Sequence, residues 1–157
     1  MFDKFITLTL ENEGGYTYDT GGETKFGISK RSYPNVDIEN LTKEDAINIY
    51  KRDYYNPLYD HISDSNVSFK LFDIGVNIGK TNAVKRLQWT LNDYYKEELI
   101  ADGIFGKKTL GSVNKHKYLY PLLLLEYSLY YKAISKSTNN KYLAGWLKRL
   151  YKHYKEI

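Results

Sequence analysis

The opening stretch is the sequence feature that most constrains the fold, because a helical apolar pattern stops there at two consecutive glycines. At 100° per residue, the apolar side chains of this stretch fall on one broad face: Phe2, Phe5, Ile6, Leu8 and Leu10. Gly14 can adopt the left-handed conformation that ends a helix, and Gly15 lets the chain leave sharply. The pattern therefore predicts a helix that runs to about residue 13 and then gives way to extended chain.

Glu13 is a candidate general acid because of where this helix places it. It follows Leu10 by three residues and lands inside the apolar face, whereas Glu11 lands nearly opposite and is expected to be solvated. Burial and the negative end of the helix dipole both raise the pKa of a carboxyl group and keep it protonated near neutral pH, as a general acid requires. The alternative is a helix-end cap or a lysine partner, which the pattern alone favours.

The segment from Glu11 to Ile28 resembles the opening of the glycoside hydrolase family 108 muramidases, which are lysozymes found in phages and bacterial secretion loci. Their motif is a helix that ends Glu-Gly-Gly-Tyr, followed by Asp-x-Gly-Gly-x-Thr-x-x-Gly-Ile. Here it corresponds to Glu13, Gly14, Gly15, Tyr16, Asp19, Gly21, Gly22, Thr24, Gly27 and Ile28. The segment between Tyr16 and Asp19 is shorter than is usual in the family. The resemblance implies that Glu13 is the general acid.

The same resemblance implies further roles around a cleft. Asp19 or Thr24 would assist catalysis, and the substrate would contact Tyr16, Gly22 and Phe26. The alternative for Asp19 is an Asx turn before the glycines. Retention and inversion both stay open, because the distance between the two carboxyl groups decides between them. We predict that residues 24–29 form a short extended piece, half of a small β-hairpin beside the active-site cleft.

Phe72–Gly79 resembles a second family element, Phe-Asp-x-Gly-Val-Asn-x-Gly. The resemblance implies that Asp73 and Asn77 bind substrate near the cleft floor. An asparagine amide both donates and accepts hydrogen bonds, as recognition of a sugar acetamido group requires. Without the resemblance, Asn77 is a polar residue near the end of a helix and Gly79 is its cap.

Two later segments point to the same context. Asp102–Thr109 resembles the Asp-Gly-x-x-Gly-x-x-Thr loop of small peptidoglycan-binding helical repeats, although a plain connection between helices is the alternative. Residues 144–149 resemble the Gly-Trp-x-x-Arg ending of these enzymes. We expect Trp146 to be a core anchor rather than a sugar platform.

Periodicity and end signals place the remaining helices. The predictions are a helix capped by Thr42 and ended by Asn56-Pro57, a helix from Ser65 or Asn66, a helix capped by Thr81, a helix from about Tyr118 and a last helix over about Leu143–Tyr154. No linker, repeat or charge block divides the chain. We predict one mainly α, lysozyme-like domain over residues 1–157, with a catalytic half at about 1–80 and a helical peptidoglycan-binding-like half at about 81–157 packed on it.

The amino-acid composition excludes some kinds of functional site and favours some kinds of partner. The chain has no cysteine, so disulfides and cysteine-based metal or redox sites are excluded, and its three histidines lie far apart without ligand spacing. We expect no metal and no cofactor. The net charge of +4 suits an anionic partner such as a cell wall, a membrane surface or nucleic acid. No nucleic-acid motif is present and Lys and Arg are scattered, so we expect no nucleic-acid partner.

The N-terminus lacks the basic leader and apolar core of a secretory signal peptide. The longest apolar run, about Tyr118–Leu125, is far shorter than the ~20 residues that span a bilayer. We therefore expect a monomer that is made in the cytoplasm without an integral membrane segment and is released to the cell wall by another factor.

The resemblance implies a muramidase that hydrolyses the β-1,4 bond between N-acetylmuramic acid and N-acetylglucosamine in peptidoglycan. Its biological use would be bacteriolysis, as by a phage endolysin, or wall remodelling for secretion. Three alternatives remain: a lytic transglycosylase, a non-catalytic peptidoglycan-binding or phage structural protein, and a basic nucleic-acid binder.

Overall fold

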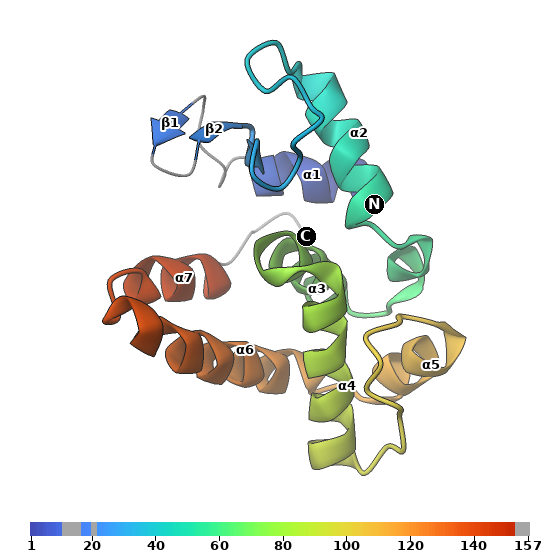
Figure 1. The fold of residues 1–157 in the computed structure, drawn as a ribbon. Coiled ribbons are helices and arrows are strands. Elements are labelled where there is room, and N and C mark those ends of the chain that lie inside the picture. The colour runs from blue at the N-terminus through green and yellow to red at the C-terminus, as the bar shows by residue number, and fades with distance from the viewer. Residues whose placement is uncertain (11–16, 20–21, 153–157) are drawn as a thin grey trace. The chain divides into compact units, whose positions relative to one another are not determined.

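A computed structural model describes residues 1–10, 17–19 and 22–152. The chain forms two compact units, Met1–Tyr55 and Asn56–Ile157, whose elements are labelled in Figure 1. The described part is mainly α-helical with one small antiparallel sheet, which confirms the predicted lysozyme-like fold class. The division into halves near residue 80 stays a prediction. No helix in the described ranges combines the length and the apolar character that a membrane crossing needs.

Unit 1 consists of two helices and the sheet. Its elements are α1 (Phe2–Leu10), β1 (Thr17–Asp19), β2 (Gly22–Lys25), β3 (Ile28–Ser29) and α2 (Lys43–Asp53). The apolar face of α1 is buried, as predicted from its spacing. Thr42 caps α2 as predicted: its hydroxyl accepts a hydrogen bond from the Asp45 amide, and the Asp45 carboxylate accepts one from the Thr42 amide. The ring of Phe2 packs edge-on against Tyr55, with centroids 5.0 Å apart.

The sheet corrects the prediction for residues 24–29, which are not one extended piece. Phe26 and Gly27 form a two-residue turn between β2 and β3, and Lys25 pairs with Ile28 across it. Both turn residues have positive φ, 52° and 76°, as a type I′ hairpin turn requires. Phenylalanine is a poor signal for such a turn, because bulky residues rarely adopt positive φ.

Unit 2 is helical. Its elements are the 3₁₀ helix η1 (Pro57–His61), α3 (Ser65–Ile78), α4 (Lys80–Tyr95), α5 (Lys107–Lys115), α6 (Leu119–Ser135), the 3₁₀ helix η2 (Lys136–Thr138) and α7 (Leu143–Leu150). Helix α3 is buried over residues 67–75 and packs against α4 and α6. Helix α7 packs against α6, so these two helices form a hairpin (Figure 1).

Helix ends confirm some sequence signals and correct others. Helix α3 begins at Ser65 and ends at Ile78 with Gly79 as its C-cap, both as predicted; Gly79 has a φ of 90°, and the Asp64 side chain caps the other end. Thr81 is not the cap of α4, because α4 begins at Lys80 directly after Gly79 and has no side-chain cap. The positive φ of Gly79 turns the chain within one residue and lets α4 start early. Helix α7 ends at Leu150, sooner than predicted.

Candidate functional site

The predicted catalytic segment follows directly after α1. Glu13 and Tyr16 lie outside the described residues, so their roles stay predictions. The described part of helix α1 runs to Leu10, three residues before Glu13, and Phe5 and Ile6 are 1% and 3% exposed. The chain therefore enters the Glu13 segment from a helix that is fixed in the core of unit 1.

The sheet follows that segment along the chain. The backbone of Asp19 pairs with that of Gly22 at the end of β1, while the Asp19 side chain lies outside the description. Gly22 has a φ of 96°, which L side chains rarely adopt. The family motif therefore requires glycine at this position for its backbone conformation. Contact of Gly22 with substrate stays a prediction.

Thr24 is the middle member of a row of hydroxyl groups across the sheet. It pairs with Thr17 on one side and Ser29 on the other, and directly paired residues project to the same face. Ile28, which pairs with Lys25 and belongs to the opposite face, is 1% exposed. The hydroxyl row thus lies on the face turned away from Ile28, and Thr24 is partly exposed there. Its hydroxyl can donate to or accept from a sugar or a water molecule.

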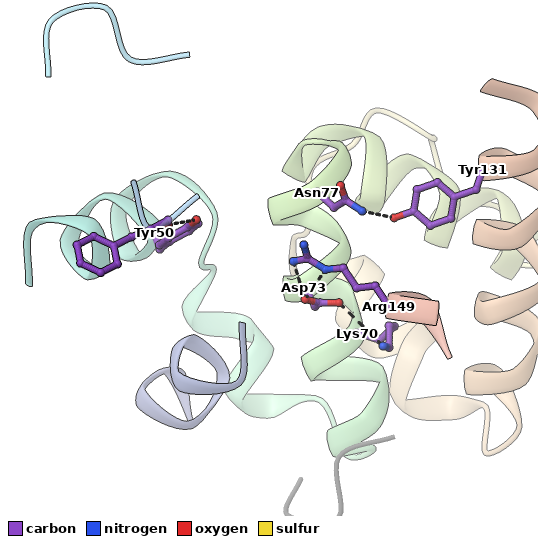
Figure 2. A network of polar contacts seen from close by, with 7 residues as sticks. Tyr50, Lys70, Asp73, Asn77, Tyr131 and Arg149 are labelled. Carbon is purple, nitrogen blue, oxygen red and sulfur yellow. Dashed lines mark hydrogen bonds and ion pairs between the residues drawn. The ribbon is translucent and has the colours of Figure 1, made fainter. Parts of the chain in front are cut away.

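Phe26 occupies a strained position at the tip of the β2–β3 hairpin. A φ of 52° is unfavourable for a bulky residue, and such outliers cluster at functional sites. The hydroxyl of buried Tyr50 donates to the Phe26 carbonyl at 2.9 Å (Figure 2). Lys25 Nζ lies 5.8 Å from the centroid of the Phe26 ring and donates to the Glu39 carbonyl. These contacts fix a half-exposed aromatic ring at the hairpin tip, and its predicted contact with substrate remains untested.

Asp73 lies at the centre of a buried charged cluster in unit 2 (Figure 2). Its Oδ1 accepts hydrogen bonds from Arg149 Nη2 at 2.9 Å and Nε at 3.2 Å. The side chain of Asp73 is 0% exposed, and Lys70 Nζ lies 4.0 Å from Asp73 Oδ2. Burial lowers the pKa of Lys70, while the Asp73 carboxylate opposes that shift. Two segments that were identified separately by resemblance, in α3 and α7, are therefore joined by an ion pair. A substrate contact by Asp73 stays a prediction.

Asn77 connects α3 to an aromatic cluster on α6 and α7. Its Nδ2 donates to the Tyr131 hydroxyl at 2.7 Å (Figure 2). The Tyr131 ring is 1% exposed and stacks on Trp146, with centroids 5.5 Å apart. Burial raises the pKa of Tyr131. Trp146 itself is half-buried: its ring packs on Tyr131 of α6 and keeps part of its surface accessible, so its predicted role as a core anchor stays a prediction. The predicted contact of Asn77 with substrate remains untested.

A groove in unit 1 was not anticipated from the sequence. It has a volume of about 510 Å³ and is lined by Val36, Asp37, Asn40, Leu41, Asp45, Asn48, Ile49 and Arg52. Hydrogen bonds from Asn40 lower the pKa of Asp37, and hydrogen bonds from Thr42 lower that of Asp45. Both carboxyl groups are therefore held ionised by local turn and cap contacts, which disfavours them as general acids. Of the predicted site residues that the structure describes, none lines this groove.

Gln88 organises the loop after α4, and sequence reasoning missed it. Its Oε1 accepts from the Gly103 amide at 2.9 Å, and its Nε2 donates to Asp102 Oδ1 at 3.1 Å. Gly103 has a φ of 80°, and a Cβ added there would lie 2.7 Å from the Thr81 carbonyl oxygen. The Asp-Gly signal located the turn, but the buried amide that fixes it lies 15 residues earlier in the chain.

Two family models match successive parts of the chain. Residues 6–79 match the family model described as glycosyl hydrolase 108, and residues 82–151 match the one described as a predicted peptidoglycan domain. The chain is similar to the solved structure described as that of Brucella abortus SagA, with a TM-score of 0.71 and 23% identity over 95% of this chain and 92% of that one. At this identity the similarity supports the fold alone. No curated protein sequence matches the chain.

Proposed function

Since the chain belongs to the glycosyl hydrolase 108 family and carries a peptidoglycan-binding-like region at its C-terminal end, we propose that it is a lysozyme-type muramidase. The bond cleaved is the β-1,4 linkage between N-acetylmuramic acid and N-acetylglucosamine. The observation that carries the proposal is the motif Glu13-Gly14-Gly15-Tyr16, which lies inside the matched residues and directly follows the buried helix α1.

In the proposed reaction Glu13 donates its proton to the glycosidic oxygen as the bond from that oxygen to the muramic acid anomeric carbon breaks. The N-acetylglucosamine hydroxyl leaves, and a water molecule supplies the hydroxyl that completes the muramic acid end. Water attacks either directly or after a covalent intermediate, with Asp19 or Thr24 assisting. Each turnover therefore produces one new reducing muramic acid end.

The described residues supply binding groups that suit a sugar chain. The hydroxyl row around Thr24 offers donors and acceptors on one face of the sheet. The constrained ring of Phe26 offers an apolar surface beside it in the same unit, and Asn77 offers an amide in unit 2. We assign these groups to substrate binding, together with Tyr16, Gly22 and Asp73 from the family motifs.

The proposed biological setting is the bacterial cell wall. A monomer made in the cytoplasm would reach the wall after another factor releases it, and would act there in lysis, as a phage endolysin does, or in wall remodelling for secretion. The net charge of +4 favours association with an anionic wall.

Product analysis of digested sacculi tests the proposal. The soluble fragments are reduced with borohydride and their modified end sugar is identified by mass spectrometry. The proposal predicts reduced muramic acid ends. Anhydro-muramic ends would identify a lytic transglycosylase, and reduced glucosamine ends would place the cut at the other linkage. Binding to sacculi without fragment release would indicate a non-catalytic wall protein.

A further inference from the structure

Helix α6 is apolar on the side turned to solvent as well as on the side turned to the core. It packs on α3, α4 and α7 (Figure 1). The buried side carries Leu119, Leu123, Leu124, Tyr127 and Tyr131. At 100° per residue, a second set of apolar positions lies opposite these, within a sector of about 60°. This second set, which we call the α6 stripe, consists of Tyr118, Leu122, Leu125 and Leu129.

The α6 stripe reaches solvent along its whole length. Tyr118 is 78% exposed, Leu125 is 42% exposed and Leu129 is 52% exposed. Leu122 is half-buried among them. The stripe covers three helical turns, about 16 Å. A surface helix ordinarily presents polar side chains opposite its core face, and contiguous exposed apolar surface marks a site of interaction with a protein or a membrane.

Positive charges lie at both ends of the α6 stripe. Exposed Lys117 precedes it, and exposed Lys132 and Lys136 follow it on the same side of the helix. Glu126 is the only carboxylate between Lys117 and Lys136. Its Oε1 accepts a hydrogen bond from Arg86 Nη1 at 2.6 Å, so its charge is compensated. The partner that complements this surface is therefore apolar inside and anionic at its boundary with water.

The same charges disfavour a second copy of this chain as the partner. In a parallel pair of stripes Lys132 would face Lys132, and in an antiparallel pair Lys136 would face Lys117. Like charges that face each other across an interface weaken binding. An anionic lipid bilayer has no such conflict, because its phosphates attract the lysines while its acyl chains accept the apolar side chains.

We propose that the α6 stripe binds the surface of an anionic phospholipid bilayer. Leu125 and Leu129 enter the boundary between headgroups and acyl chains, and Tyr118 lies at the level of the headgroups, where an aromatic ring with a polar tip is favoured. Lys132 and Lys136 extend their ammonium groups to the phosphates. The helix lies along the bilayer surface and does not cross it. This interaction goes beyond the proposed function, which requires no lipid.

Co-sedimentation of the intact chain with unilamellar vesicles tests the proposal. One set of vesicles contains equimolar phosphatidylglycerol and phosphatidylcholine, and the other contains phosphatidylcholine alone. At low salt we expect binding to the anionic vesicles to be tighter by about tenfold or more, because each lysine near an anionic surface strengthens binding about fivefold. Equal binding to both vesicles, or binding to neither, would overturn the proposal.

Substitution of the two exposed leucines tests the apolar part of the surface. Leu125→Gln with Leu129→Gln is expected to weaken binding to the anionic vesicles about tenfold or more, because the bilayer no longer takes two apolar side chains out of water. The matched control is Ile100→Gln with Ile104→Gln, in the segment between α4 and α5, where these side chains are 78% and 68% exposed. The control is expected to leave binding nearly unchanged, and equal losses in the two pairs would overturn the proposal. Circular dichroism verifies that each variant is folded.

Substitution of two lysines tests the charged part of the surface. Lys132→Gln with Lys136→Gln is expected to weaken binding to the anionic vesicles about tenfold at low salt and little at high salt, because salt screens exposed charges. Lys96→Gln with Lys107→Gln removes the same charge from exposed residues elsewhere in unit 2 and is expected to have a smaller effect. Equal losses in these two pairs would indicate attraction by net charge alone and would also overturn the proposal.

Sedimentation without lipid distinguishes the bilayer from a second copy of the chain. A dimer that Leu125→Gln with Leu129→Gln converts to a monomer would overturn the bilayer as the partner. The vesicles contain no peptidoglycan, so this inference and the proposed function fail separately. Absence of vesicle binding would refute the α6 surface and leave the muramidase standing, whereas vesicle binding without fragment release from sacculi would support the surface and refute the muramidase.

Discussion

Replacing Asp73 by asparagine tests the buried cluster that joins α3 to α7. The substitution keeps the shape of the side chain and removes its charge, so the Lys70 ammonium, 1% exposed, and the Arg149 guanidinium, 17% exposed, both lose their ion pair with Asp73. Removing one partner of a buried ion pair costs about 3–5 kcal/mol. Arg149 keeps some contact with water, so we expect a loss near 3 kcal/mol, a large part of the about 5–15 kcal/mol that stabilises a domain.

Two further substitutions serve as controls for the loss of stability in Asp73→Asn. Lys70→Met removes a cation that has no hydrogen-bond partner within the described residues, and Asp73 keeps its bonds to Arg149. Replacing a buried charge by an apolar chain of similar volume is often neutral or stabilising, so we expect a change within about 1 kcal/mol. Arg52→Ala removes a surface pair with Asp53 whose arginine is 67% exposed, and is expected to cost less than about 1 kcal/mol.

Urea denaturation followed by tryptophan fluorescence measures these changes. The chain has two tryptophans, Trp89 and Trp146, and both lie in unit 2 with the cluster, so the signal reports the unfolding of that unit. The predicted order of destabilisation is Asp73→Asn far above Arg52→Ala, with Lys70→Met near zero or stabilising. An Asp73→Asn loss as small as that of Arg52→Ala would refute the argument that a buried carboxylate holds α7 to α3.

Three further predictions follow from single contacts. Gly103→Ala is expected to lower the free energy of unfolding by about 1–3 kcal/mol, because it strains the backbone and clashes with the Thr81 carbonyl. Gly111→Ala, in open space on α5, is expected to raise the free energy of unfolding by about 0.5–1 kcal/mol. Urea midpoints measure both changes, and equal effects would contradict the strain at Gly103. Hydrogen bonds, of which that from Lys115 is the strongest, lower the pKa of Glu97 from 4.5 to about 2. The stabilising contribution of the Glu97 carboxylate is therefore complete above pH 4.5 and is lost as the pH falls toward 2. Glu97→Gln should flatten this part of the plot of unfolding free energy against pH, and an unchanged plot would contradict this role of Glu97. Phe26→Gly is expected to raise the thermal midpoint by relieving strain while lowering fragment release from sacculi, and unchanged release would remove Phe26 from substrate binding.

The sequence predicted those elements whose conformation depends on residues close together in the chain. The buried face of α1, the Thr42 cap and the end of α3 at Gly79 all follow from spacing and residue type within a few positions. The turn at Phe26 was missed because its conformation contradicts the preference of the residue and depends on a hydrogen bond from Tyr50, 24 positions away.

Local sequence patterns could not predict the contacts around the candidate site, because these contacts join residues that are far apart in the chain. Asp73 and Arg149 are separated by 76 positions, and Asn77 and Tyr131 by 54, so periodicity could identify each helix but not its partner. The ring contacts of Tyr131 with Tyr130 and Trp146 could not be predicted for the same reason: the sequence contains seventeen tyrosines, and only the packing of the helices shows which of them meet another ring. The Glu13 motif, in contrast, is contiguous and was recognisable from the sequence.

Fragment release from sacculi by Glu13→Gln and Glu11→Gln proteins tests the central claim most directly. Both substitutions remove one carboxyl group, and the two positions are two residues apart. The account predicts that Glu13→Gln lowers the rate of release by about 10²- to 10⁴-fold with a nearly unchanged thermal midpoint, while Glu11→Gln stays close to the unsubstituted protein. Release retained by Glu13→Gln, or lost equally in both variants, would contradict Glu13 as the proton donor.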